Sequence, residues 1–284
     1  MTAQRHSQIP SDQAVENRAT LELPKTSSSA RRPNSGTRTQ RVLNRRRLGS
    51  LFVPRLQRGF AIYLPLICKV VGADLDPESE VFVEALSRWQ QTVGLPETGL
   101  VDEASWSRLV SEFQSQRIKE RTYPSEEQLV LVPSHEFYHP ERPAELRRVE
   151  TTAYRAYKRM VAEAMKDPSL GLMAASNGEL HPDEKYMKII SAFRSREYQD
   201  NLRKAAPRAG RGALAVNSPH FTGRALDLYV GGDPVSTKDN NRLLQTNTAV
   251  YKWLVKNAER FGFHPYYYEP WHWEYIPESD KSSD

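Results

Sequence analysis

Two short motifs near the carboxyl terminus guide the interpretation of this chain: Ser218-Pro219-His220-Phe221-Thr222-Gly223-Arg224-Ala225-Leu226-Asp227 and Glu269-Pro270-Trp271-His272-Trp273-Glu274. The first sets His220 seven positions before Asp227, and the second sets a glutamate three positions before His272. Two imidazoles and one carboxylate suffice to hold a metal ion with a position open for water, and a further carboxylate is left to move protons. Together the motifs predict a hydrolytic zinc site.

The residues around the first motif support this interpretation. Gly223 separates the two candidate ligands, so we expect His220 in a loop and a strand over residues 225–230. Alternation along the strand puts Asp227 and Tyr229 on one face. A carboxylate in so apolar a segment is costly to bury unless it is paired or binds a metal. The alternative, a surface strand with a solvated aspartate and a loop histidine, suits His220 alone, whereas the two motifs together favour a metal site.

The order of these motifs carries a family resemblance. Ser-x-His-x-x-Gly-x-Ala-x-Asp, followed by Glu-x-x-His, resembles the VanY-type D-alanyl-D-alanine carboxypeptidases, in a group of zinc peptidases that includes D-Ala-D-Ala dipeptidases and some phage endolysins. A third segment, residues 191–199, resembles the family's S-G-Y-R-S-x-x-x-Q motif, with Ala192 for the usual glycine and Phe193 for the usual tyrosine. The resemblance covers about residues 125–277.

For the metal centre, the resemblance implies that His220, Asp227 and His272 bind one zinc ion per chain and that Glu269 is the general base. The chemistry agrees with these roles. Zinc polarises an amide carbonyl and acidifies a water, while a carboxylate takes the proton and delivers it to the leaving amine.

For the substrate, the resemblance implies that Arg194 acts near the scissile carbonyl, where its charge would offset a developing oxyanion. Ser218 is expected to orient the loop or to contact the substrate, and Gln199 is also expected among the substrate-binding residues. For Arg194 an ion pair with a nearby carboxylate is the structural alternative.

A second sequence pattern competes with this assignment. His135-Glu136-Phe137-Tyr138-His139 matches H-E-x-x-H, a zinc motif that works only when a helix puts both histidines on one face. Pro133 precedes the segment and Pro140 follows it, and a residue before proline is disfavoured in a helix. We therefore predict a loop here and no metal site.

Charge and composition divide the chain further. Residues 1–50 hold ten lysines and arginines against three acidic residues, so the net charge of +5 arises in this tail and the remainder is net acidic. The tail is polar and nearly free of aromatic residues, which predicts disorder. It is not expected to bind a specific nucleic acid. The single cysteine, Cys68, lies in an apolar run and is expected to be a buried small side chain.

Residues 51–113 are expected to form a small all-α domain of three helices. One is expected over Glu80–Val93, with Val81, Ala85, Trp89 and Val93 on its apolar stripe, and a later one is expected to be capped by Asp102. Residues 86–106 resemble the peptidoglycan-binding domain of bacterial wall hydrolases, and a three-helix spacer is the alternative.

A connector over residues 114–145 then leads to a catalytic domain over residues 146–284. For this domain we predict an α+β fold with a small antiparallel sheet flanked by helices. Expected helices span residues 150–166, 195–204 and 243–260, and expected strands span residues 186–193, 225–230 and 270–276. The basic stretch Arg203–Gly212 is expected to be a flap near the site.

The combined prediction is a zinc-dependent hydrolase that cleaves the terminal D-Ala-D-Ala bond of peptidoglycan stem peptides. The alternatives are an endopeptidase or endolysin-like amide hydrolase on the same scaffold, and a non-catalytic wall-binding protein with a structural metal. Expected partners are stem peptides and wall polymer, and the chain is expected to be a monomer without a transmembrane segment. The substrate implies the cell envelope or the exterior, although no signal peptide is recognisable.

Overall fold

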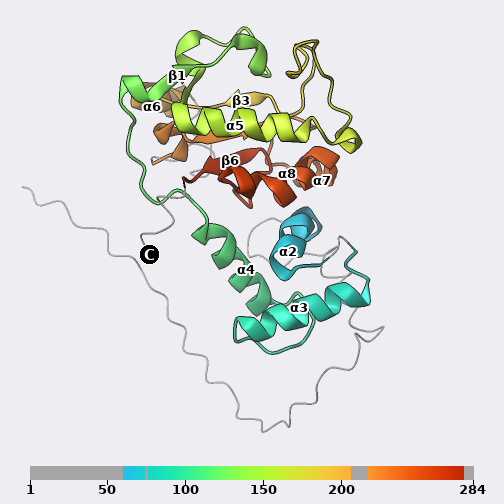
Figure 1. The fold of residues 1–284 in the computed structure, drawn as a ribbon. Helices are drawn as coiled ribbons and strands as arrows, with labels where there is room; N and C mark the ends of the chain where they lie inside the picture. Colours follow the sequence, from blue (N-terminus) through green and yellow to red (C-terminus); the bar gives the residue numbers. More distant parts are fainter. Residues whose placement is uncertain (1–59, 74–75, 206–216, 278–284) are drawn as a thin grey trace, which may run out of the picture. The chain divides into compact units, whose positions relative to one another are not determined.

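The computed structural model describes residues 60–73, 76–205 and 217–277. The predicted basic tail, residues 1–50, lies outside the described residues, as does most of the predicted flap Arg203–Gly212. Within the described ranges, no helix is both long and apolar enough to span a membrane. The architecture is α+β, with helices preceding a small antiparallel sheet, which confirms the predicted fold class (Figure 1).

The amino-terminal part is helical, as predicted. Its elements are η1 (Phe60–Tyr63), α2 (Leu64–Val71), α3 (Glu80–Thr92) and α4 (Glu103–Ser115). Side chains cap two of these helices: Ser79 Oγ accepts a hydrogen bond from the Phe82 amide at 3.1 Å, and Asp102 Oδ1 accepts one from the Ser105 amide at 2.8 Å. Pro65 lies in the first turn of α2, where a missing N–H costs no intrahelical bond.

The buried face of α3 differs from the predicted stripe at its beginning. Ala85 and Trp89 are buried as expected, but Val81 is 52% exposed. Phe82 and Leu86 take its place in the core. A four-residue step turns a helix by slightly more than one revolution, so a stripe drawn at four-residue intervals drifts around the helix and leaves the core at one end.

Gln90 organises the turn between α3 and α4. Its buried side-chain amide donates hydrogen bonds to Leu100 O at 3.0 Å and Ser105 Oγ at 2.9 Å, and accepts one from the Gly99 amide at 2.8 Å. Gly99 has φ +62, and a Cβ on it would lie 2.7 Å from Cγ1 of Val83. The glutamine and the glycine of the predicted wall-binding motif therefore build this turn.

The main sheet has strand order β3-β4-β6-β5, and all neighbouring strands are antiparallel. Its strands are β3 (Ile189–Ser191), β4 (Ala225–Leu228), β5 (Phe263–Pro265) and β6 (His272–Tyr275). Sequence patterns predicted β3, β4 and β6 with longer bounds, but missed β5, since three residues are too few to show alternation. In register, Ser191 pairs with Asp227, which pairs with His272.

A second, two-stranded sheet pairs β1 (Leu129–Leu131) with β2 (Arg148–Glu150) antiparallel. Short 3-10 turns complete the connections: η2 (Glu126–Gln128), η3 (Ser134–Glu136), η4 (Ala144–Leu146), η5 (Pro168–Leu170), η6 (Pro219–Thr222) and η7 (Ala258–Phe261).

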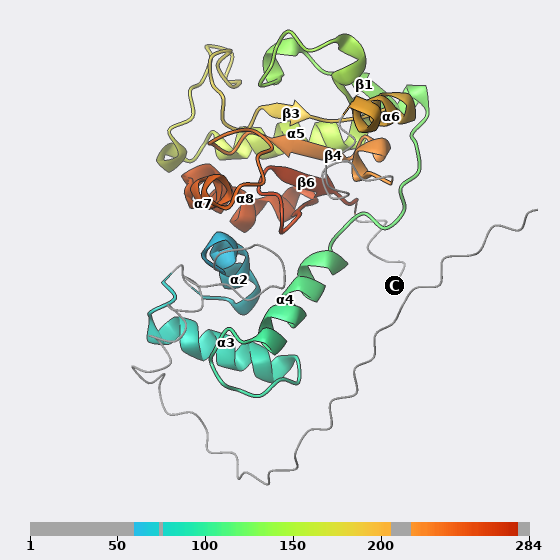
Figure 2. The same cartoon turned by 180° about the vertical axis from the view of Figure 1, so that it is seen from behind.

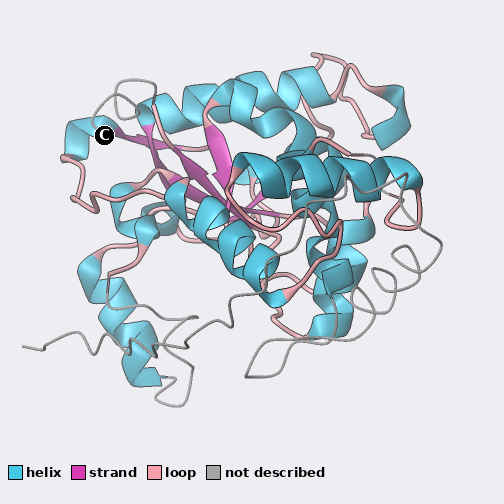
Figure 3. Cartoon of the chain, turned by 90° about the horizontal axis from the view of Figure 1, so that it is seen from below, coloured by secondary structure: helices cyan, strands magenta, loops and turns pink. Residues whose placement is uncertain are grey.

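Helices flank the strands, as Figures 2 and 3 show. Two of them, α5 (Thr151–Ala164) and α6 (Arg196–Ala205), confirm predicted helices. The single helix predicted at residues 243–260 is instead two, α7 (Asp239–Asn247) and α8 (Ala249–Asn257). Thr248 separates them: its backbone is extended, and its hydroxyl accepts a hydrogen bond from the Tyr251 amide at 3.2 Å. Threonine favours such a cap position over a helix interior.

The amino-terminal helices share one buried hydrophobic cluster with the sheet region, and Cys68 belongs to it as predicted. Trp106 of α4 packs against Tyr267, which precedes β6, with ring centroids 6.4 Å apart. Arg242 of α7 is fully buried and donates to the Tyr63 hydroxyl at 3.0 Å. The domain boundaries placed at residues 113 and 145 stay predictions.

Candidate metal centre

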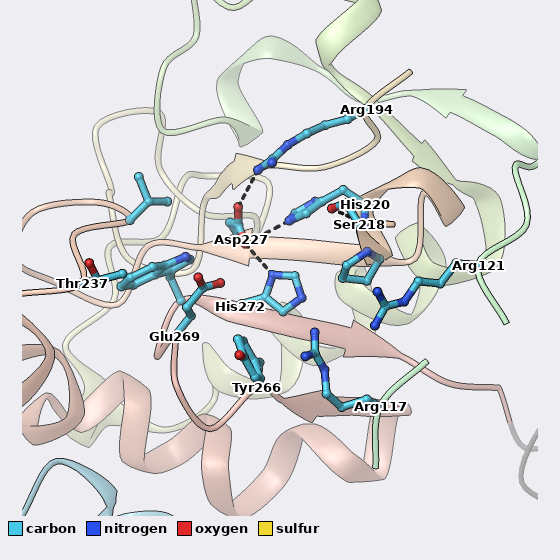
Figure 4. A pocket seen from close by; sticks show the side chains of 13 residues that line it. Arg117, Arg121, Arg194, Ser218, His220, Asp227, Thr237, Tyr266, Glu269 and His272 are labelled. Carbon is cyan, nitrogen blue, oxygen red and sulfur yellow. Dashed lines mark hydrogen bonds and ion pairs between the residues drawn. The ribbon is translucent and has the colours of Figure 1, made fainter. Parts of the chain in front are cut away.

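The three predicted metal ligands meet in the structure. His220, Asp227 and His272 are all buried, and one ligand atom from each lies within 4.8 Å of the other two. Asp227 Oδ1 is 3.3 Å from His220 Nε2 and 2.9 Å from His272 Nδ1 (Figure 4). Among the residues that the structure describes, no other group of three or more histidine, cysteine or acidic side chains is placed to hold a metal ion.

Local structure explains how His220 reaches this position. It lies in η6, where Ser218 Oγ accepts a hydrogen bond from the His220 amide at 3.3 Å. Gly223 ends the turn with φ +67, and a Cβ there would lie 3.0 Å from both the Glu150 amide nitrogen and Leu129 Cδ2. Only glycine adopts this conformation without strain so close to another backbone. The chain then enters β4 and reaches Asp227.

Hydrogen bonds fix which ring nitrogens point at the centre. His220 Nδ1 donates to the Ala192 carbonyl at 2.8 Å, and His272 Nε2 donates to Glu274 Oε1 at 3.1 Å. Carbonyl oxygens and ionised carboxylates only accept, so these two nitrogens carry hydrogens, whereas His272 Nδ1, which faces Asp227 Oδ1 at 2.9 Å, would have to be free of its hydrogen to bind a metal. His220 Nε2 and His272 Nδ1 are therefore presented to the centre. Two imidazole nitrogens with fixed tautomers and one carboxylate fit a divalent metal such as zinc.

The charges in this group are strongly coupled. Burial, together with the nearby Arg194, lowers the pKa of His220 to about 4. Burial alone would raise the pKa of Asp227, but the two histidines outweigh it and hold that pKa below its usual value. For His272, hydrogen bonds to Asp227 and Glu274 outweigh burial and raise the pKa to about 9. Asp227 thus remains ionised, as a metal ligand must.

Arg194 forms an ion pair with Asp227, which was the alternative to a role in substrate binding. Its NH2 lies 3.3 Å from Asp227 Oδ2, and its Nε and NH2 donate to Ser191 Oγ at 3.1 and 3.0 Å. The Arg194 side chain also lines the cavity beside the three ligands. An ion pair and a substrate contact are compatible here, so the substrate role stays a prediction.

A cavity of about 350 Å³ opens beside the ligands. Its lining includes Arg194, Ser218 and Glu269, all predicted site residues. Gln199, the other predicted substrate-binding residue, is buried in α6 and is not among the lining residues. Its role in substrate binding stays a prediction.

Glu269 lies in the turn before β6, where the His272 amide donates to the Glu269 carbonyl at 2.9 Å. Its carboxylate points toward His272 and Asp227 in Figure 4. Burial raises the pKa of Glu269, even though His272 nearby lowers it. A carboxylate with a raised pKa binds a proton more readily, which suits a general base.

Several residues that line the cavity were not predicted from the sequence. They are Arg117, Arg121, Val235, Thr237 and Tyr266. Glu274 accepts a hydrogen bond from His272 Nε2. It belongs to the second motif, but the motif predicted no role for it. The two arginines lie in the predicted connector, so far from the motifs along the chain that no local pattern could have linked them to the site.

The competing H-E-x-x-H segment forms no helical zinc motif, as predicted. η3 ends at Glu136, and Phe137 is extended. The buried Glu136 carboxylate accepts hydrogen bonds from the Tyr154 hydroxyl at 3.0 Å and from Lys158 Nζ at 2.8 Å. His139 lies beside Glu141 instead.

Comparison with known proteins agrees with the site. Residues 147–278 match the family model VanY, described as D-alanyl-D-alanine carboxypeptidase. This range contains His220, Asp227 and His272, together with Arg194 and Glu269. No curated protein matches the chain.

The match does not extend to residues 51–113, whose assignment as a peptidoglycan-binding domain stays a prediction. The sequence resemblance is confirmed for the carboxyl-terminal part. Residues 147–278 therefore match a VanY-type domain, of the family described as D-alanyl-D-alanine carboxypeptidase.

Proposed function

We propose that the chain is a zinc-dependent D,D-carboxypeptidase that removes the terminal D-Ala from peptidoglycan stem peptides. One observation carries this proposal: three buried ligand atoms converge within 4.8 Å beside a cavity that also presents the Glu269 carboxylate. A closed structural metal site needs neither a cavity nor an additional carboxylate. The arrangement therefore favours an enzyme over a wall-binding protein with a structural metal.

His220 Nε2, Asp227 Oδ1 and His272 Nδ1 would hold the zinc ion. When bound, zinc would polarise the scissile carbonyl and lower the pKa of a water molecule. The protein contributes the fixed ligand orientation, since hydrogen bonds to the Ala192 carbonyl and to Glu274 hold the two imidazole rings in place.

Glu269 would move the protons. Its carboxylate accepts a proton from the attacking water and then delivers it to the nitrogen of the leaving D-Ala, so that the amine departs uncharged. Partial burial keeps the carboxylate basic enough for both steps.

Arg194 would stabilise negative charge that develops on the carbonyl oxygen. Bonds to Ser191 and Asp227 hold the guanidinium in place, and the Arg194 side chain lines the cavity. A charged donor fixed in advance stabilises an oxyanion without reorganisation during the reaction.

The amino-terminal helices would bind wall polymer and raise the local concentration of stem peptides. The substrate lies outside the cytoplasm, so we place the working protein in the cell envelope or the exterior, acting as a monomer. Sedimentation of the full chain with insoluble peptidoglycan in the presence of a chelator tests the binding role apart from hydrolysis.

Mass spectrometry of purified muropeptides after incubation with the zinc-loaded protein tests the reaction. Pentapeptide muropeptides are expected to lose one alanine, and the Glu269→Gln protein serves as the control. Loss of an intact D-Ala-D-Ala unit, or opening of cross-links with terminal residues intact, would instead indicate a dipeptidase or an endopeptidase.

A further inference from the structure

Glu274 is the most deeply buried acidic side chain at the metal centre, with its side chain 1% exposed. It accepts a hydrogen bond from His272 Nε2 at 3.1 Å. On its other side it accepts from Arg117 Nε at 2.9 Å, from Arg117 NH2, and from the Ile118 amide at 2.7 Å. One carboxylate thus joins a metal ligand to a distant segment of the chain.

A buried carboxylate is stable only when paired and fully hydrogen-bonded. Glu274 lies within the family domain, but its cationic partner does not, because Arg117 precedes the matched range 147–278 by thirty positions. The connector therefore supplies a cation that pairs with the buried Glu274 carboxylate beside His272.

Further contacts hold Arg117 in place. Its guanidinium carbon lies 3.9 Å from the centroid of the Tyr266 ring, which fixes the plane of the group. Ile118 is buried next to it. On the other side, Phe113 of α4 stacks on Tyr267 with ring centroids 6.0 Å apart. In Figure 4 the Arg117 guanidinium lies beside Tyr266, on the side of the cavity where His272 also lies.

We propose that Arg117 is a positioning residue of the metal centre that acts through Glu274. The Arg117 guanidinium holds the Glu274 carboxylate, the carboxylate holds the Nε2–H of His272, and this bond would keep Nδ1 of His272 in place to bind the metal. The inference rests on the proposed metal binding by the three ligands, and it requires no particular substrate. The connector thereby becomes part of the active centre.

Zinc affinity of the full-length protein, measured by competition with a chelating dye, tests this role. Arg117→Ala is expected to weaken zinc binding by about 10- to 100-fold, the usual effect of removing a group that orients a ligand. Lys119→Ala removes the same charge from an exposed position of the same connector and is expected to leave zinc affinity unchanged. Equal zinc affinity in folded Arg117→Ala and in the parent would overturn the proposal.

A double-mutant cycle shows whether Arg117 acts through Glu274. Glu274→Gln keeps an acceptor for His272 but removes the buried charge that needs Arg117. In this background Arg117→Ala is expected to change zinc affinity by less than about threefold. If the two substitutions weaken zinc binding additively, Arg117 acts by another route and the proposal is wrong. If Arg117→Ala alone folds poorly, zinc affinity is compared between Glu274→Gln and the double variant, which leaves no unpaired buried charge, and a difference above about threefold contradicts the proposal.

Nitrogen NMR of the histidine rings gives a second readout that general destabilisation would not move. In the zinc-loaded parent, the Nε2–H signal of His272 is expected at the chemical shift of a hydrogen bond to a carboxylate, and in Arg117→Ala this shift is expected to shrink as Glu274 loses its fixed position. A protein that shows these zinc effects but cleaves no stem peptide would refute the proposed function and leave the inference about Arg117 intact.

Discussion

Asp227 and His272 lie directly opposite one another on β4 and β6, and Asp227 Oδ1 is 2.9 Å from His272 Nδ1. Ser191 on β3 is the partner of Asp227 on the other side. His272, Asp227 and Ser191 therefore form one row across three neighbouring strands, and Ser191 Oγ accepts hydrogen bonds from Arg194. A register shift of one position would turn a ligand to the opposite face of the sheet, so the strand pairing itself specifies the centre.

Metal content follows from this arrangement. The purified protein is expected to hold about one zinc per chain and to lose activity when a chelator removes it. His220→Ala is expected to empty the site, whereas His135→Ala and His139→Ala are expected to leave it filled. Elemental analysis of the purified variants measures this, and zinc lost from the His135 or His139 variant would contradict the assignment.

Glu269→Gln separates proton transfer from binding. The amide keeps the size of the side chain but cannot take a proton, so turnover is expected to fall by about a hundredfold or more. Zinc affinity and substrate affinity are expected to survive. Steady-state kinetics on a peptide ending in D-Ala-D-Ala, with Glu141→Gln as an exposed carboxylate control, provides the measurement. Turnover at the parent rate would remove Glu269 from the mechanism.

Arg194→Ala is expected to lower kcat by about 100- to 1,000-fold, as the loss of an oxyanion donor does. Ser191→Ala is expected to have a smaller effect of the same kind, because Ser191 Oγ only holds the Arg194 guanidinium. Zinc content measured alongside kcat tells the two roles of Arg194 apart. If the loss of activity follows a loss of zinc, Arg194 acts through Asp227 and not on the substrate.

Substitution of two glycines tests the packing of the turn that Gln90 stabilises. Both Gly94 and Gly99 have positive φ, but a Cβ on Gly94 meets nothing within 4 Å, whereas one on Gly99 would lie 2.7 Å from Val83 Cγ1. Gly94→Ala is expected to cost about 1–2 kcal/mol for the left-handed conformation alone. Gly99→Ala is expected to cost more, because the clash with Val83 adds to that strain. Equal shifts in thermal unfolding would show that the close contact has no energetic effect.

Features encoded by neighbouring residues could be predicted from the sequence. The cap at Asp102, the helix at α5 and the glycine before β4 each depend on side chains a few positions apart, where local sterics and hydrogen bonds dominate. The three candidate ligands could be predicted for the same reason, since each lies in a short motif with a characteristic spacing. The break at Thr248 was missed, because both sides of it carry helical patterns and the cap is a single residue.

Residue types and local spacing thus predicted the α+β class, the three candidate ligands and the candidate base. The tertiary structure established the register that sets Asp227 opposite His272, the strand β5 and the contact of Arg117 with Glu274. These features join residues far apart in the chain. Their free energy comes from burying apolar surface and pairing charges between segments, and no single stretch of sequence contains both partners.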